Sequence, residues 1–215
     1  SYCMTQTAPF PPLKRGLVAI LRGLRPEEAI EIGRVVYEAG VDAIEVPLNS
    51  PDPFASIASL VSELPETALV GAGTVLTPAD VDNLAMAGGR LLVSPNIDAA
   101  VMGRAAYHGM VTMPGVFSPT EALQAIRLGA SALKFFPANV LGAAGIAAMR
   151  AVLPRDVNVG AVGGVSEKDF PAYLAAGVSV FGLGSSLFKP GMRPDEVGER
   201  ARAAVAGWDA ATRAA

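Results

Sequence analysis

The chain has 215 residues, of which 51% are hydrophobic and 17% are charged, a composition that favours a large folded core over disorder. Its formal net charge of −3 provides no basic field, so nucleic acid is not expected as the main partner. No apolar run approaches the ~18 residues that a bilayer-spanning helix requires, so no membrane association is expected.

The N-terminal stretch "SYCMTQTAPFPPLKRG" lacks the apolar segment of a signal peptide. We predict a tail at residues 1–15 and a single domain at residues 16–215. The only cysteine, Cys3, lies in this tail, so neither an intrachain disulfide nor a cysteine nucleophile in the core is expected. A cytoplasmic protein is the default expectation.

Along the chain, short apolar or glycine-rich runs alternate with stretches rich in alanine, glutamate and arginine. Several of the latter begin at proline, serine or aspartate and end at glycine, which is typical of helices. The predicted strands cover residues 16–23, 43–48, 69–76, 91–96, 110–116, 132–138, 158–165 and 180–188. The predicted helices cover residues 26–40, 51–64, 78–89, 98–109, 118–129, 142–153, 166–177 and 194–208.

Strand–helix pairs of roughly 20–30 residues, repeated in this way, predict a (β/α)8 TIM barrel. An open doubly wound sheet is the alternative, but similar units without a long insertion favour closure. The carboxyl ends of the strands of such a barrel meet at one mouth, where function is located. Polar residues at or near these ends are Arg22, Glu45, Asn49, Thr74, Ser94, Asn96, Lys134, Ser185 and Ser186.

One lysine interrupts the apolar run "ASALKFFPAN". A buried ammonium group is unfavourable unless it is paired or deprotonated. Strand alternation places Lys134 on the same face as Ala132, and Glu45 on the same face as Ala43. If these faces point into the barrel, both ionisable side chains project into its interior. A structural role is the alternative, either as an ion pair that fills the barrel or as a lysine whose end reaches water.

The functional interpretation of Lys134 is an amine that forms an imine. Desolvation lowers the pKa of a lysine and leaves a neutral amine that can attack a carbonyl group. The protonated imine then acts as an electron sink, and Glu45 can move the protons directly or through water.

Other chemistries lack the residues that they need. The only histidine, His108, is predicted at the solvated C-terminal end of a helix, which leaves neither a Ser-His-Asp triad nor a histidine-ligated metal site. The "GAGT" at residues 71–74 is not followed by the spacing of a dinucleotide fingerprint. We therefore expect neither a metal nor an organic cofactor.

The runs "AVGGV" and "GLGSSLF" end the last two predicted strands. Glycines there expose backbone N–H groups, and the corresponding loops of barrel enzymes often bind phosphate. Tight turns without a ligand are the alternative. Neither turn carries lysine or arginine at its tip, so the backbone is expected to provide most of the recognition. The candidate residues are Gly163, Gly164, Gly184 and Ser185.

Short motifs occur in a consistent order: "IEVPLNSP", "GAGTVL", "SPN", "MPGV", "ALKFFPA", "AVGGV" and "GLGSSL". Together they resemble the class I aldolases that cleave 2-keto-3-deoxy-6-phospho sugar acids, a (β/α)8 family. The resemblance extends from about Leu17 to Lys189. It implies cleavage of a phosphorylated 2-keto-3-deoxy sugar acid to pyruvate and D-glyceraldehyde 3-phosphate, and a homotrimer.

The resemblance also implies roles for individual residues. Lys134 in "LKFFP" matches the Schiff-base lysine, and Glu45 in "IEVPL" matches the acid/base. Arg22 in "AILRG" resembles the carboxylate-binding residue of the galactonate branch, while Thr74 and Pro95 match residues at the pyruvate end. The residues that match the phosphate site are Gly163, Gly164, Gly184 and Ser185.

Two positions depart from the gluconate-type branch of this family. That branch carries arginine shortly after the catalytic glutamate, where this chain has Asn49, and threonine before the Gly-Gly pair, where this chain has Val162. Both differences resemble the 6-phosphogalactonate branch, so 2-dehydro-3-deoxy-6-phosphogalactonate is the expected substrate. The gluconate epimer, use of both epimers, and a non-catalytic phosphosugar-binding barrel are the alternatives.

Overall fold

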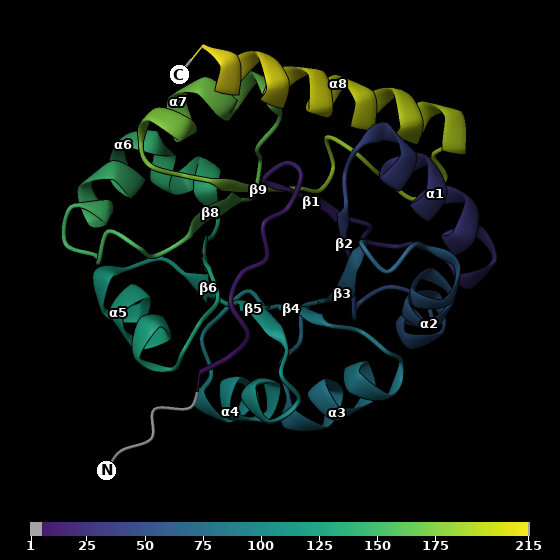
Figure 1. Cartoon of the computed structure of the whole chain (residues 1–215), viewed down its shortest axis with the longest axis horizontal. Helices are drawn as coiled ribbons and strands as arrows, with labels where there is room; N and C mark the ends of the chain where they lie inside the picture. The colour runs from purple at the N-terminus through teal and green to yellow at the C-terminus, as the bar shows by residue number, and fades with distance from the viewer. Residues whose placement is uncertain (1–5, 215) are drawn as a thin grey trace.

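Parallel strands buried on both faces form the centre of the fold, and helices surround them (Figure 1). The computed structural model describes residues 6–214. The strands are β1 (Leu17–Ile20), β2 (Ala43–Pro47), β3 (Leu69–Gly73), β4 (Leu91–Val93), β5 (Val111–Met113), β6 (Gly115–Val116), β7 (Leu133–Phe135), β8 (Val159–Val162) and β9 (Val180–Leu183). The helices are α1 (Ala29–Ala39), α2 (Pro53–Glu63), α3 (Pro78–Met86), α4 (Ala99–Tyr107), α5 (Pro119–Arg127), α6 (Ala138–Arg150), α7 (Phe170–Ala175) and α8 (Pro194–Arg213), with 3-10 helices η1 (Pro26–Glu28) and η2 (Glu167–Asp169) before α1 and α7.

Within the described residues, the strands form one parallel sheet in the order β5-β4-β3-β2-β1-β9-β8-β7-β6. Strands that follow one another in the sequence are neighbours, except β5 and β6, which stand at the two ends of this order. β1 pairs with β9, without the reversal of order that defines a doubly wound sheet. β5 and β6 are two parts of one predicted strand and are separated by Pro114, which has no N–H for the ladder. The sheet therefore returns to its starting point, and the predicted (β/α)8 barrel is confirmed.

The observed elements differ from the predicted ones mainly at their ends. Most of the polar and glycine residues at the barrel mouth lie in loops beyond the observed strand ends, whereas Glu45 and Lys134 lie within β2 and β7. Helix α6 begins at Ala138 instead of residue 142, and Gly142 interrupts its helical geometry with a φ of 71°. The predicted helix is therefore preceded by one additional short turn.

Side chains that face the barrel interior are separated from those that pack against the helices, as strand alternation requires. Ala43 of β2 and Ala132 before β7 belong to the interior cluster. Glu45 and Lys134 follow two residues later on the same strands, so they also face the interior, as predicted. The interior cluster comprises Val18, Ile20, Ala43, Leu69, Leu91, Val93, Val111, Met113, Ala132, Val162 and Val180.

The described part of the predicted tail covers the barrel at the N-terminal ends of the strands. Ala8 and Phe10 pack against the interior cluster, and this segment crosses the centre of the ring of strands in Figure 1. The Thr7 hydroxyl donates to Gly129 O at 2.6 Å, and the Thr7 N–H donates to the same oxygen at 3.1 Å. Residues 6–15 thus pack onto the barrel, while the domain boundary after residue 15 stays a prediction.

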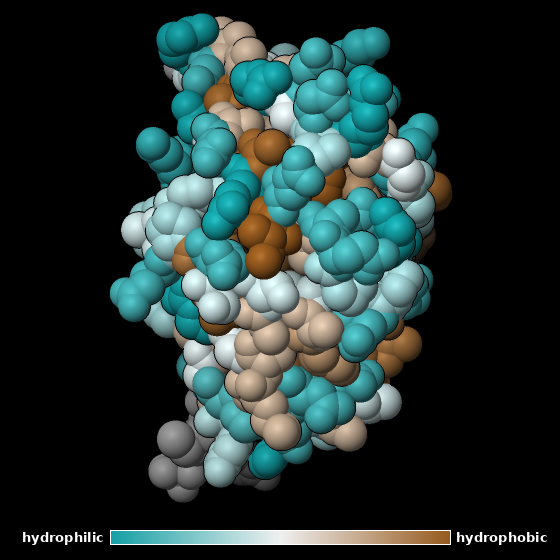
Figure 2. Space-filling view, turned by 90° about the vertical axis from the view of Figure 1, so that its right-hand side faces the viewer, coloured by the Kyte–Doolittle hydropathy of each residue, from teal (hydrophilic) through white to brown (hydrophobic). Residues whose placement is uncertain are grey.

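The outer surface is predominantly hydrophilic on the side that carries α1 and α2, with a small group of hydrophobic residues near the upper centre of the view (Figure 2). No helix in residues 6–214 combines the length and the apolar composition needed to cross a membrane. Cys3 lies outside the described residues.

The close packing of β3 against β4 makes Gly71→Ala a test of the barrel geometry. An added Cβ atom at Gly71 would lie 1.7 Å from Leu91 O, so we expect a loss of stability of at least the ~1–3 kcal/mol typical of overpacking. Gly103→Ala in α4 is the control, because no heavy atom lies within 4 Å of its added Cβ and alanine is favoured in helices by ~1 kcal/mol. Urea unfolding measures both variants, and equal stabilities would contradict this packing.

Candidate active site

Lys134 and Glu45 lie on opposite sides of the barrel interior. Their strands, β7 and β2, are separated by four steps in either direction around the ring when β5 and β6 are counted as one strand. Lys134 is 6% exposed and Glu45 is 2% exposed, so both side chains are enclosed. This low exposure favours an enclosed Lys134 over one that extends into bulk water, and its functional role stays a prediction.

Burial shifts the pKa values of both groups toward neutrality. Desolvation raises the pKa of Glu45 to about 7, against the opposing effect of the Lys134 and Arg22 charges. Desolvation also lowers the pKa of Lys134 to about 8, opposed by Glu45 and assisted by Arg22. Lys134 is therefore partly a neutral amine at mildly alkaline pH, and Glu45 can take up and release a proton near neutral pH.

One oxygen of the Glu45 carboxylate has no protein partner. Among the described residues, Oε2 is buried and forms no hydrogen bond. It lies over Gly73, where an added Cβ atom would come within 2.2 Å of it. Because buried polar atoms are normally hydrogen-bonded, this oxygen marks a position for a water molecule or a substrate hydroxyl group.

A cavity of about 850 Å³, here called the mouth cavity, opens at the C-terminal ends of the strands. Phe136 lines it, and the centroid of the Phe136 ring lies 4.6 Å from Lys134 Nζ, so the lysine is next to the cavity wall. The predicted site residues that line it are Arg22, Val162, Gly163, Gly164, Gly184 and Ser185. It is also lined by Asn49, Ser186, Lys189 and Arg200, which the motifs did not assign to the site.

Thr74 and Pro95 are not part of the mouth-cavity lining and lie at the C-terminal ends of β3 and β4. Thr74 has a φ of 54°, a conformation that is uncommon for residues other than glycine. Pro95 O lies beside β6, at 2.2 Å from where a Cβ atom of Gly115 would be, and Gly115 is paired in register with Lys134. Pro95 is therefore near the lysine strand, and the roles of both residues stay predictions.

Arg22 contacts Asn49, which the sequence marks as a polar residue near a strand end and as a departure from the gluconate-type branch. Arg22 Nη1 donates to Asn49 Oδ1 across the loops that follow β1 and β2. The Gly23 N–H joins the same loops by donating to Ser50 Oγ at 2.9 Å. Asn49 therefore orients the guanidinium group. The polar residue at a strand end was the available sequence signal, but the contact depends on the pairing of β1 with β2.

Two glycine-containing turns form another part of the mouth cavity, which we call the turn wall: residues 163–166 and 184–186. Gly163 and Gly164 have φ values of 108° and 65°, which glycine adopts without strain. In the described structure, the backbone N–H groups of Gly164, Ser185 and Ser186 donate to no protein acceptor. These groups have no competing protein acceptor, and their role in anion binding stays a prediction.

Lys189 and Arg200 bring positive charge to the mouth cavity. The sequence predicts recognition mostly by backbone groups, because neither turn carries a cation at its tip. Lys189 follows the second turn in the chain, whereas Arg200 comes from α8. Nothing in the local sequence around Arg200 distinguishes it from a solvated helix residue, so only the tertiary fold reveals its position.

His108 forms a contact between two outer helices. It follows α4 as the C-cap residue, and its Nε2 lies 2.7 Å from Asp82 Oδ1 of α3. The predicted position at a helix C-terminus is confirmed. The side chain is 23% exposed, however, so it is partly buried against α3 and not fully solvated as predicted.

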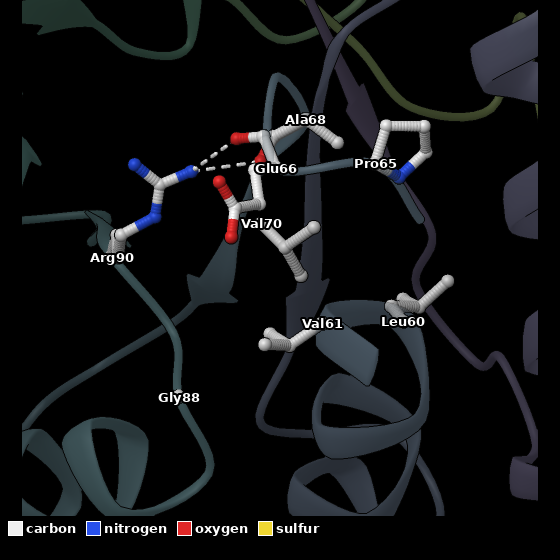
Figure 3. A pocket seen from close by; sticks show the side chains of 8 residues that line it. All are labelled: Leu60, Val61, Pro65, Glu66, Ala68, Val70, Gly88 and Arg90. Atoms are coloured by element: carbon white, nitrogen blue, oxygen red, sulfur yellow. Dashed lines mark hydrogen bonds between the residues drawn. The ribbon is translucent and has the colours of Figure 1, made fainter. Parts of the chain in front are cut away.

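A second hollow, of about 470 Å³, lies near the N-terminal ends of β3 and β4, away from the barrel mouth (Figure 3). Arg90 reaches across it, and its Nη2 donates to Glu66 O at 3.2 Å and to Ala68 O at 2.9 Å. These hydrogen bonds attach the Arg90 guanidinium group to backbone carbonyl groups of the loop before β3. No predicted site residue lines this hollow.

The sequence and the fold are both similar to those of known aldolases. A family model described as "KDPG and KHG aldolase" matches residues 13–199. The chain is 60% identical over 202 residues to the "Probable 2-dehydro-3-deoxy-6-phosphogalactonate aldolase" of Rhizobium meliloti (strain 1021), covering 94% of this chain and 95% of the relative. It is 45% identical over 192 residues to the "2-dehydro-3-deoxy-6-phosphogalactonate aldolase" of Escherichia coli (strain K12), covering 89% and 94%. The solved "Native KDPGal structure" has a TM-score of 0.93 and 42% identity, covering 95% of this chain and 99% of that one.

The lowered pKa of Lys134 is measurable by ¹³C NMR of protein labelled at the lysine Cε atoms. The signal that is lost in Lys134→Met is expected to titrate near pH 8 in the wild-type protein, below the ordinary lysine value of 10.5. In Glu45→Gln the Lys134 pKa is expected to fall further, because the opposing negative charge is removed. A wild-type titration at the ordinary value would contradict the desolvated environment of Lys134.

Proposed function

The chain belongs to the KDPG and KHG aldolase family and is a carbon–carbon lyase, and we propose that it cleaves 2-dehydro-3-deoxy-6-phosphogalactonate through a Schiff base on Lys134. The observation that carries this proposal is the enclosed Lys134 amine, with a pKa of about 8, opposite the unpartnered Oε2 of Glu45. The galactonate assignment is supported by the names of the two relatives, and by Asn49 and Val162 in this chain.

Substrate binding uses two ends of the site. Arg22, oriented by Asn49, donates to the substrate carboxylate, for which a planar guanidinium group is well suited. The phosphate group accepts hydrogen bonds from the N–H groups of the turn wall, including those of Gly164 and Ser185. Binding at both ends positions the C2 ketone at Lys134.

The reaction begins when the neutral Lys134 amine attacks the C2 ketone. The resulting carbinolamine loses water, with protonated Glu45 as the proton donor, and forms the protonated imine. The Glu45 carboxylate then accepts the proton of the C4 hydroxyl group. The C3–C4 bond breaks and its electron pair moves toward the imine nitrogen, which gives an enamine and releases D-glyceraldehyde 3-phosphate.

The second half of the reaction regenerates the amine. Carbon C3 of the enamine takes up a proton, which restores the protonated imine. Water then attacks C2, the C2–nitrogen bond breaks, and pyruvate leaves with Lys134 as an amine again. Glu45 is the residue that exchanges these protons, since its pKa of about 7 allows both states at physiological pH.

The gluconate epimer, or use of both epimers, is the alternative within the family. A non-catalytic phosphosugar-binding barrel would bind the substrate without releasing pyruvate, which a coupled pyruvate assay detects. We also propose a homotrimer, supported by the family resemblance, and a cytoplasmic location as the default.

Borohydride reduction in the presence of pyruvate tests the Schiff base. A reduced adduct is expected on the peptide that contains Lys134, because only a neutral, enclosed amine combines with the ketone efficiently. Lys134→Arg is expected to lose the adduct and essentially all turnover, since arginine stays protonated. Lys168→Arg is the matched control and is expected to retain both. An adduct on Lys14, Lys168 or Lys189 would refute the assignment.

The two C4 epimers test the substrate assignment. Val162 is 5% exposed, lines the mouth cavity and offers only methyl groups to a substrate hydroxyl. Leaving that hydroxyl unpaired costs ~1–3 kcal/mol, or one to two powers of ten in kcat/KM. We therefore expect wild-type protein to prefer the galacto substrate, and Val162→Thr to shift the kcat/KM ratio toward the gluco epimer. A wild-type protein that strongly favours the gluco epimer would contradict this assignment but not the Schiff base.

A further inference from the structure

Arg200 of α8 lines the mouth cavity together with the two turns of the turn wall. Its Nη1 donates to Ser186 O at 3.2 Å, which holds the guanidinium group at the turn after β9. Within residues 6–214, Arg200 forms no ion pair with an acidic side chain, whereas Arg193 of the residues before α8 pairs with Asp195. A positive charge that has no counterion among the described residues therefore lies on the cavity wall.

The donors around Arg200 match the chemistry of a phosphate group. A guanidinium group has five N–H donors, of which the structure engages one, so the remaining donors are available to a ligand. The N–H groups of Ser185 and Ser186 are also available. Arginine binds phosphate with two parallel hydrogen bonds, which adds directional contacts to those from the backbone.

We propose that Arg200 is a substrate-binding residue that contacts the phosphate group and supplies the positive charge that the two turns lack. Lys189, on the same cavity wall, adds a second positive charge. This inference rests on the proposed function, because the anion is the phosphate group of the sugar acid. It assigns the discrimination between phosphorylated and unphosphorylated sugar acids to a residue of the last helix.

A different role for Arg200 is to brace the turn after β9 through Ser186 O alone. The two roles differ in what they affect. A brace acts on every substrate, because it keeps the cavity wall in place. A phosphate contact acts only on ligands that carry the phosphate group.

The test compares kcat and KM of wild type and Arg200→Gln on 2-dehydro-3-deoxy-6-phosphogalactonate and on its unphosphorylated analogue. We expect Arg200→Gln to lower kcat/KM for the phosphorylated substrate roughly 10–100-fold, mainly through KM, because it removes a hydrogen-bonded charge. Turnover of the unphosphorylated analogue and imine formation with pyruvate are expected to stay unchanged. Arg202→Gln, on the same helix but outside the cavity lining, is the matched control and is expected to resemble wild type.

Calorimetric titration with inorganic phosphate provides a readout that does not depend on turnover. Wild type and Arg202→Gln are expected to bind phosphate more tightly than Arg200→Gln. Equal losses of kcat/KM on both substrates, or unchanged phosphate binding in Arg200→Gln, would overturn the inference. The contact with Ser186 O would then be the only role of Arg200. Failure of wild type to cleave the phosphorylated substrate would refute the proposed function, whereas phosphate binding in the variants still decides the role of Arg200.

Discussion

Desolvation of two opposite charges inside a closed barrel is the constraint on which the site depends. Neither Lys134 nor Glu45 is accessible enough to be solvated as an isolated ion, and the barrel interior places them on opposite strands. Desolvation lowers the pKa of the amine to about 8 and raises that of the carboxyl group to about 7. The same burial that is unfavourable for folding therefore produces a nucleophile and a proton carrier near neutral pH.

The rest of the barrel maintains this environment. The sheet closes through the pairing of β1 with β9. On either side of Pro114, β5 pairs with β4 and β6 pairs with β7, so the divided fifth strand connects both of its neighbours. Residues 6–15 cover the N-terminal end of the barrel with apolar side chains, so the interior is reached from the opposite end. There the strands end in polar and glycine residues that form the mouth cavity. The N-terminal end of the barrel thus contributes packing, and the C-terminal end carries the candidate active site, as is usual for this fold class.

The sequence predicts the features that depend on local pattern. A lysine in an apolar run, and a glutamate at an alternating position, identify the two buried ionisable groups without knowledge of the tertiary structure. The glycine-containing runs "AVGGV" and "GLGSSLF" likewise identify the turn wall. The sequence does not predict contacts between segments that are distant in the chain. The contact of Arg22 with Asn49 requires the pairing of β1 with β2, and the position of Arg200 requires α8 to lie beside the turn that follows β9.

Boundary errors have a similar physical origin. The sequence predicts that a helix starts at Gly142. In the structure Gly142 lies inside α6 with a φ of 71°, because the residues before it already form a helical turn. The sequence predicts one continuous strand through Pro114. In the structure the missing N–H of Pro114 divides this strand into β5 and β6. The sequence predicts a solvated His108, because it does not show that Asp82 lies beside this residue. In each case a tertiary or backbone constraint overrides the local pattern.

The most direct measurement of the central claim is the free energy of unfolding of wild type and Glu45→Gln/Lys134→Met as a function of pH. Burial raises the Glu45 pKa, so wild type loses stability as the pH rises from 4.5 to about 7, where the folded state binds the extra proton. Burial lowers the Lys134 pKa, so wild type regains stability as the pH rises from about 8 to 10.5, where the unfolded state binds the extra proton. The stability advantage of the double variant is therefore expected to be largest between pH 7 and 8 and to decrease on both sides. A difference that is independent of pH, or largest at the extremes, would contradict the account.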